Sequence, residues 1–119
     1  MQYMLLIYSN PAQEPAYGTP EFQAMIGGYF AAKEQMKTDG VLVAGEGLKG
    51  IDTATSLRIK SGKVETMDGP FAETREHLGG YYIVNVPDLD AALKYAALIP
   101  AAHYGTVEVR PLMDYNPTN

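Results

Sequence analysis

The sequence predicts one α+β domain, and its length, its composition and the order of its periodic segments indicate this. A chain of 119 residues is long enough for one packed core and too short for two full domains. Apolar residues make up 46% and charged residues 19% of the chain, a composition typical of globular proteins. We therefore expect a single domain over residues 1–119, in which residues 113–119 form a C-terminal tail.

The first third of the chain predicts a strand, a long helix and a second strand. Residues 3–8 (YMLLIY) form a continuous apolar run, which is typical of a strand buried on both faces. Thr-Pro-Glu at positions 19–21 is a helix start, with Thr as the N-cap and Pro as the first helical residue. Gly40 is the expected C′ residue, so we predict a helix over residues 20–38 and a strand over residues 41–44.

The rest of the chain predicts a hairpin followed by a strand, a helix and a strand. Residues 57–60 and 63–67 are short strands joined by a Ser-Gly turn. A strand over residues 81–86 precedes a helix over residues 88–99, whose start has an Asp as N-cap. The last strand is expected over residues 106–112.

The order of these elements is β-α-β, an inserted β-hairpin, and β-α-β, which is the ferredoxin-like split βαβ plan. Both helices then lie on one face of a four-stranded sheet. The first strand is apolar on both sides, however, so its second side would form an exposed apolar patch. A second copy of the sheet is the expected cover, which predicts a homodimer. The two sides consist of Met4, Leu6 and Tyr8, and of Tyr3, Leu5 and Ile7.

Charge and residue usage exclude several classes of function. The formal net charge is −5 and the nine Lys and Arg residues are scattered, so we expect no direct nucleic-acid binding. With no cysteine and only two histidines, we predict no metal site. No phosphate-binding glycine loop or dinucleotide motif is present, and we predict no cofactor. The chain shows no signal peptide and no apolar run long enough to span a membrane, so we expect a cytoplasmic protein without membrane contact.

Several segments together resemble one family. The segment DGPFAETRE occupies residues 68–76, LGGYYIV follows at residues 78–84, and VPDLDAA and VEVRP stand at residues 86–92 and 107–111. In these segments, and in the first strand, the chain resembles the DGPF branch of the YCII-related family. The resemblance covers nearly the whole chain, and it implies a dimeric α+β barrel.

The same resemblance implies two roles. Members of the wider family are suspected of enzymatic activity because of a characteristic His and Asp, and Asp68 matches the Asp. The His expected near the start of the first helix is absent, because the only histidines are His77 and His103. Some similar proteins occur with extracytoplasmic-function sigma factors, which implies an accessory or regulatory role instead.

The candidate site residues cluster after the hairpin. Asp68 precedes Gly-Pro, where it either forms a turn or faces a pocket. Glu73, Arg75, Glu76 and His77 form either a solvated charged loop or the border of a pocket opposite Glu46.

In the functional interpretation, Asp68, Glu76 and His77 are the candidate catalytic acid–base groups. Arg75 is expected to bind a carboxylate or phosphate of the ligand. Glu46 and Arg110 are further candidate ligand contacts. Arg110 and Glu108 form either a solvated edge or a pair between subunits. Phe71 is expected to be a plug under the loop.

Two hypotheses follow. In the first, a homodimer binds a small molecule in a pocket between the sheet and the insertion loop, and acts as a cofactor-free acid–base enzyme. In the second, the chain is a non-catalytic accessory or regulatory module associated with an extracytoplasmic-function sigma factor. The comparison with small isomerases and cofactor-free monooxygenases is one of fold only.

Overall fold

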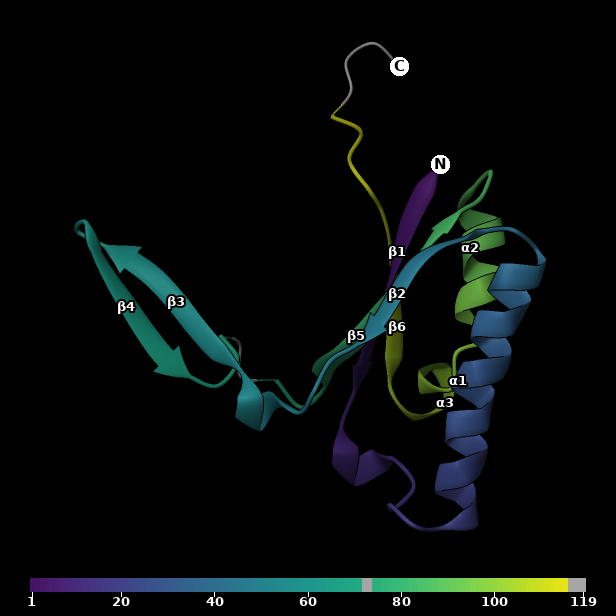
Figure 1. Ribbon diagram of the computed structural model, residues 1–119, viewed down its shortest axis with the longest axis horizontal. Helices are drawn as coiled ribbons and strands as arrows, with labels where there is room; N and C mark the ends of the chain where they lie inside the picture. Colours follow the sequence, from purple (N-terminus) through teal and green to yellow (C-terminus); the bar gives the residue numbers. More distant parts are fainter. Residues whose placement is uncertain (72–73, 116–119) are drawn as a thin grey trace.

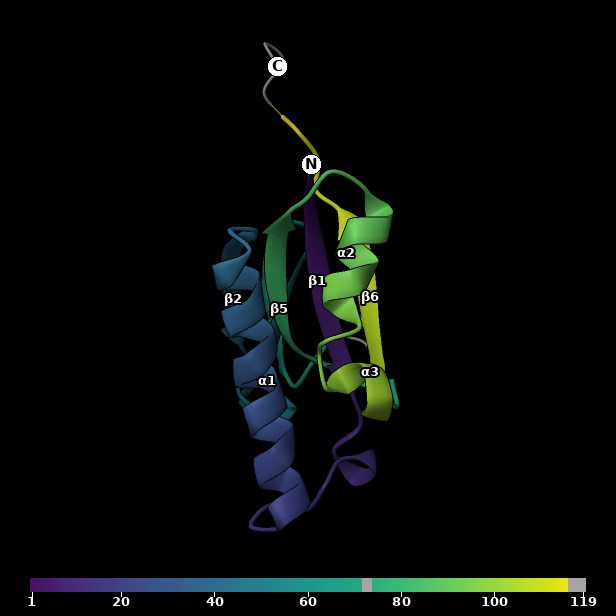
Figure 2. The same cartoon turned by 90° about the vertical axis from the view of Figure 1, so that its right-hand side faces the viewer.

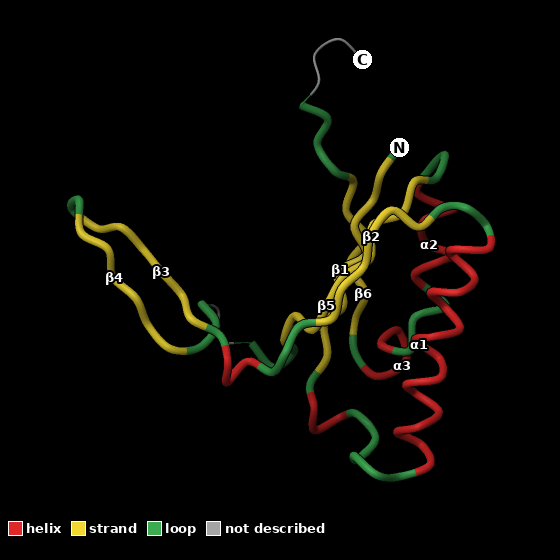
Figure 3. The backbone as a smooth tube through the Cα atoms, in the orientation of Figure 1, coloured by secondary structure: helices red, strands yellow, loops and turns green. Residues whose placement is uncertain are grey.

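Residues 1–71 and 74–115 are described by a computed structural model of the chain (Figures 1 and 3). Glu73 of the predicted charged loop and residues 116–119 of the predicted tail lie outside the described residues. The strands are β1 (Gln2–Ser9), β2 (Leu42–Gly47), β3 (Thr55–Lys60), β4 (Lys63–Asp68), β5 (His77–Asn85) and β6 (Thr106–Pro111). The helices are α1 (Pro20–Thr38), α2 (Leu89–Ala96) and α3 (Ala101–Tyr104), with short 3₁₀ turns at Pro11–Gln13 and Ile51–Thr53.

The main sheet has the strand order β2-β5-β1-β6, and every neighbouring pair is antiparallel. Figure 2 shows the helices together on one face of this sheet. The predicted α+β split βαβ plan is therefore confirmed. The inserted hairpin is confirmed as well: β3 and β4 form a separate two-stranded sheet, which we call the β3–β4 arm.

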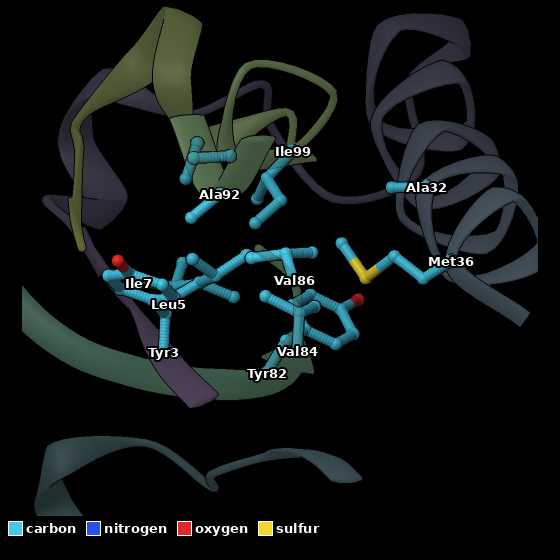
Figure 4. Close-up of a cluster of buried hydrophobic side chains, with 12 residues drawn as sticks. Tyr3, Leu5, Ile7, Ala32, Met36, Tyr82, Val84, Val86, Ala92 and Ile99 are labelled. Carbon is cyan, nitrogen blue, oxygen red and sulfur yellow. The ribbon is translucent and has the colours of Figure 1, made fainter. Parts of the chain in front are cut away.

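The hydrophobic core lies between the helices and one face of the sheet (Figure 4). Leu5 of β1 and Val84 of β5 are fully buried, and Met36 of α1 and Ile99 pack against them from the helical layer. Removing such a side chain from water contributes roughly 1.5–3 kcal/mol relative to leaving it exposed. Because alternate residues of a strand face opposite sides, Leu6 points to the sheet face that the helices leave open.

The helix starts match their sequence signals. The Thr19 hydroxyl accepts a hydrogen bond of 3.1 Å from the Phe22 N–H, and the Asp88 carboxylate accepts one of 2.9 Å from Ala91. Gly40 has φ +70°, the left-handed conformation expected after a helix. Among the described residues, no helix is long and apolar enough to cross a membrane.

Several predicted boundaries were wrong, among them the end of the strand expected over residues 41–44, because β2 continues to Gly47. The helix expected over residues 88–99 ends at Ala96, and a second helix, α3, begins after Pro100. Proline is tolerated at a helix start, because an N–H there would have no partner within the helix.

The strand expected from residue 81 begins at His77. Gly80 pairs with Ile7 and Leu78 with Tyr8, so Gly79 is the extra residue of a bulge, and beyond it β5 continues to pair with β1 as far as His77.

Two adjacent glycines in α1 have different surroundings. A Cβ at Gly28 would lie 2.8 Å from Cγ of Pro100, whereas a Cβ at Gly27 would meet nothing within 4 Å. Gly28 therefore permits the close approach of α1 to the loop before α3. Gly27 brings no such contact and only lowers the helix propensity.

We predict opposite effects for the two glycine-to-alanine substitutions. Gly27→Ala should raise the free energy of unfolding by about 0.5–1 kcal/mol, because alanine is the better helix former. Gly28→Ala should lower it, because the new methyl group overlaps the Pro100 ring. Urea unfolding of both variants measures this, and equal stabilisation by both would contradict the close α1–Pro100 contact.

Candidate functional site

A cavity of about 680 Å³ lies between α1 and the part of the sheet formed by β2 and β5. Its volume is in the range of small-molecule sites. The loop that follows β2 and leads to the β3–β4 arm also lines it. Most of the wall is apolar, including Ile7, Phe22, Met25, Ile26, Leu48 and Ile51.

Two glycines shape the sheet side of this cavity. A Cβ at Gly45 would lie 2.5 Å from Cδ1 of Tyr82, so the Tyr82 ring lies directly over the β2 backbone. A Cβ at Gly80 would lie 2.8 Å from the Glu46 carbonyl oxygen. A side chain at either position would force the two strands or the aromatic ring to shift.

Two tyrosines supply neutral hydroxyl groups to the cavity. The pKa of Tyr29 is raised to about 12, chiefly by burial and then by the charge of Glu14, although a hydrogen bond with the Ala101 backbone opposes this. Burial also raises the pKa of Tyr82. Both phenols stay protonated at neutral pH, so they can donate hydrogen bonds to a bound molecule and cannot act as bases there.

The charged groups of the cavity differ in their partners. The Ser9 hydroxyl donates a hydrogen bond to the Glu14 carboxylate at the end of β1. Lys33 of α1 is partly buried, and no ion pair engages its ammonium group among residues 1–71 and 74–115. A partly buried cation beside an apolar cavity favours an anionic group of a ligand.

Of the candidate residues predicted from the sequence, Glu46 and His77 line the cavity. Glu46 is an exposed residue of β2, whereas His77 is partly buried at the start of β5. The two strands are neighbours in the sheet. His77 therefore lies in the same cavity as Lys33, and an imidazole there can exchange a proton with a bound molecule.

The other candidates lie elsewhere in the described chain. Asp68 is exposed at the end of β4, and Arg75 is exposed in the segment before β5. The Glu76 carboxylate accepts hydrogen bonds of 3.0 and 3.1 Å from the Thr106 hydroxyl. Within the described residues, no hydrogen bond or ion pair joins Asp68 to Glu76 or His77. Their predicted catalytic roles stay predictions.

Arg110 lies on the open face of the sheet. Its guanidinium group pairs with Glu108, two residues earlier on the same side of β6, and this partner raises the Arg110 pKa. Arg110 stands opposite Met4 in the register of β1 and β6 and is not among the residues that line the cavity. Its predicted role as a ligand contact stays a prediction.

The Asp-Gly-Pro-Phe segment closes the base of the arm. Gly69 has φ +98°, a backbone conformation that favours glycine. Its N–H donates to the Ala54 carbonyl over 2.7 Å, and its own carbonyl accepts from the Ser56 hydroxyl. The prediction for Phe71 was wrong: its side chain is 62% exposed, and the Arg58 guanidinium lies 4.3 Å from the ring centroid.

The sequence patterns pointed to the loop after the hairpin and missed the contribution of α1. Neither Tyr29 nor Lys33 was among the candidate site residues predicted from the sequence. A signal was present, because Tyr29 and Lys33 are four residues apart and share the helix face of Met25 and Ile26. A lysine in line with an apolar stripe is a reason to expect a cavity beside that stripe.

Comparisons with known proteins agree on family and fold. The family described as the YCII-related domain matches residues 1–116. An uncharacterised protein, R00369 of Rhizobium meliloti (strain 1021), is 34% identical over 119 residues, which cover 98% of this chain and 96% of the relative.

A solved structure shares the fold. It is 5-chloro-2-hydroxyhydroquinone dehydrochlorinase (TftG) from Burkholderia phenoliruptrix AC1100, in complex with 2,5-dihydroxybenzoquinone. The TM-score is 0.52 with 13% sequence identity, and the match covers 95% of this chain and 94% of the enzyme. At this identity the likeness shows the fold alone.

The raised pKa of Tyr29 predicts a loss of stability in alkali. The unfolded chain loses the phenol proton near pH 10, and the folded chain keeps it until about pH 12. The free energy of unfolding should therefore fall between pH 10 and pH 12, and this group should have no effect below pH 10. Tyr29→Phe should reduce the fall without abolishing it, because Tyr82 contributes a second raised pKa.

Urea unfolding at pH 8, 10 and 11 measures this difference. Tyr17→Phe is the matched control, since Tyr17 is 89% exposed. An alkaline decline that is identical in wild type and Tyr29→Phe would show that the Tyr29 phenol is not held in its protonated form.

Proposed function

This chain belongs to the YCII-related family, and from that premise we propose that it binds a small, mainly apolar organic anion in the cavity beside α1. The observation that carries the proposal is the partly buried Lys33 at an apolar cavity of about 680 Å³. The apolar walls favour a hydrocarbon or aromatic body. The protonated phenol of Tyr29 adds a hydrogen-bond donor for an oxygen of the ligand.

As part of the same proposal, the bound molecule undergoes cofactor-free acid–base chemistry with His77 as the proton-transfer group. His77 and Lys33 line the same cavity from the sheet and from α1, respectively. An imidazole can accept or donate a proton near neutral pH, and a nearby ammonium group stabilises negative charge that develops on the substrate. Glu46 also lines the cavity, but its cross-strand partner is Tyr81, so its carboxylate lies on the open side of the sheet and takes no part in this proposal.

The ligand-binding proposal predicts that 2-naphthoate, an aromatic carboxylate used as a probe, binds in the cavity. Its addition should shift the amide NMR signals of residues 45–50 and 77–82. Lys33→Gln should weaken binding roughly tenfold, which corresponds to about 1.4 kcal/mol for one charge-assisted contact. Lys37→Gln is the matched control, because Lys37 is exposed one turn further along α1 and pairs with Glu34.

The uncharged analogue 2-naphthamide separates the two parts of this prediction. On wild type, 2-naphthamide should bind more weakly than 2-naphthoate. On Lys33→Gln, the two probes should bind with equal affinity. Equal affinity of wild type for both probes would rule out an anion site, and shifts confined to the open sheet face would rule out the cavity.

We also propose that the protein is a homodimer whose sheets meet at their open faces. Leu6, Tyr8, Tyr81 and Ile83 are apolar residues on the side of β1 and β5 away from the helices. They are only partly buried in the single chain. Covering such a patch with an identical patch is the usual way to remove it from water.

Sedimentation velocity tests the dimer. Wild type should sediment as a species of twice 13.0 kDa at micromolar concentration, and Ile83→Asp should shift it towards monomer, because a carboxylate in an apolar interface loses its hydration. A wild-type protein that is monomeric throughout this range would contradict the proposal.

The DGPF branch and the cytoplasmic location stay predictions. Association with an extracytoplasmic-function sigma factor also stays a prediction. The cavity favours the small-molecule hypothesis, on which it bears directly.

A further inference from the structure

The β3–β4 arm extends from the body of the protein and, in the part of the chain that the structure describes, pairs with no strand of the main sheet. Figure 1 shows it on the side of the sheet opposite to the helices. Its two strands pair only with each other. An isolated two-stranded hairpin is marginally stable in water at best, so an arm of this kind needs a surface to pack on.

The arm has one apolar and one polar face. Cross-strand partners lie on the same side of a hairpin, so the pairs Leu57–Thr66 and Ile59–Val64 share one face. In the single chain Leu57 is 59% exposed, Ile59 68% and Val64 61%. The opposite face carries the pairs Arg58–Glu65 and Lys60–Lys63 together with Met67, so it is the more polar of the two faces. An arm that stays in water needs no apolar face. An exposed apolar face of this kind is typical of a surface that a partner covers.

The exposed surface of the single chain is larger than that of a compact monomer, and the difference can be compared with the area of a dimer interface. A compact monomer of 13.0 kDa exposes about 6,300 Å², whereas this chain exposes 8460 Å². The radius of gyration is 16.5 Å, against about 13.5 Å for a compact chain of this length. The surplus of about 2,000 Å² per chain is on the scale that each subunit of an obligate homodimer buries.

We propose that the arm is a clasp between two copies of this chain. In the dimer, the face formed by Leu57, Ile59 and Val64 packs on the body of the partner subunit. This inference rests on the homodimer proposed above. The arm and the open sheet face lie on the same side of the molecule, so one partner seated there covers both (Figure 1).

Charge complementarity favours a second copy as the occupant. Residues 55–68 hold three of the nine basic side chains and two of the fourteen acidic ones. Lys60 and Lys63 lie next to the tip of the arm. The rest of the chain holds six basic and twelve acidic side chains, a formal charge of −6. A basic tip is therefore attracted to the acidic body of an identical subunit.

The test compares Ile59→Asp and Val64→Asp with Leu93→Asp. The first two sites are exposed in the single chain, so folding is preserved. Leu93 is 46% exposed on α2, on the far side of the sheet. The dimer dissociation constant from sedimentation velocity should rise roughly tenfold or more in each arm variant, the effect of losing one well-packed contact. It should be unchanged in Leu93→Asp.

Hydrogen exchange gives an independent readout and separates the two proposals. Amides of β3 and β4 should be protected above the dimer dissociation constant and exchange faster on dilution below it. A dimer whose arm amides exchange equally fast at both concentrations, with an unchanged dissociation constant in the arm variants, overturns the clasp and leaves the dimer intact. A monomeric wild type overturns both. Arm protection that appears only with a different protein also overturns the clasp.

Discussion

The helices cover only one face of the central sheet, and the rest of the structure depends on this asymmetry. The core forms between that face and α1, α2 and α3, with Leu5 and Val84 fully buried. On the same strands, Leu6 and Ile83 face the open side and stay partly exposed. Each apolar side chain that remains in water forgoes roughly 1.5–3 kcal/mol. The open face and the β3–β4 arm are therefore surfaces that association with another subunit would stabilise.

Gly69 and Phe71, in the segment that carries the family resemblance, make contacts with the β3–β4 arm. Gly69 adopts a left-handed conformation and ties the end of β4 to Ala54 and Ser56. Phe71 lies under the Arg58 guanidinium and reinforces the same base of the arm.

The cavity combines groups with distinct electrostatic roles. Burial keeps the Tyr29 and Tyr82 phenols protonated, so they are donors whatever the neutral-range pH. The Glu14 carboxylate accepts a hydrogen bond from Ser9, and in the proposed function the ammonium group of Lys33 binds the anionic group of the ligand. His77 contributes an imidazole, the group to which we assign proton transfer in the proposed function. In an apolar surrounding these interactions are stronger than at an exposed surface, because fewer water dipoles compete with them.

The sequence by itself determined the element order, the helix starts at Thr19 and Asp88, and the two-sided apolar strand, because caps and periodicity are local properties of the chain. It also pointed to Glu46 and His77, which both line the cavity. Only the tertiary structure decided that Tyr29 and Lys33 line the same cavity and that Asp68 stands apart at the base of the arm. Which side chains share a cavity depends on how α1 packs against β5. These two elements are far apart in the sequence, and local sequence patterns carry no information about how they lie in space.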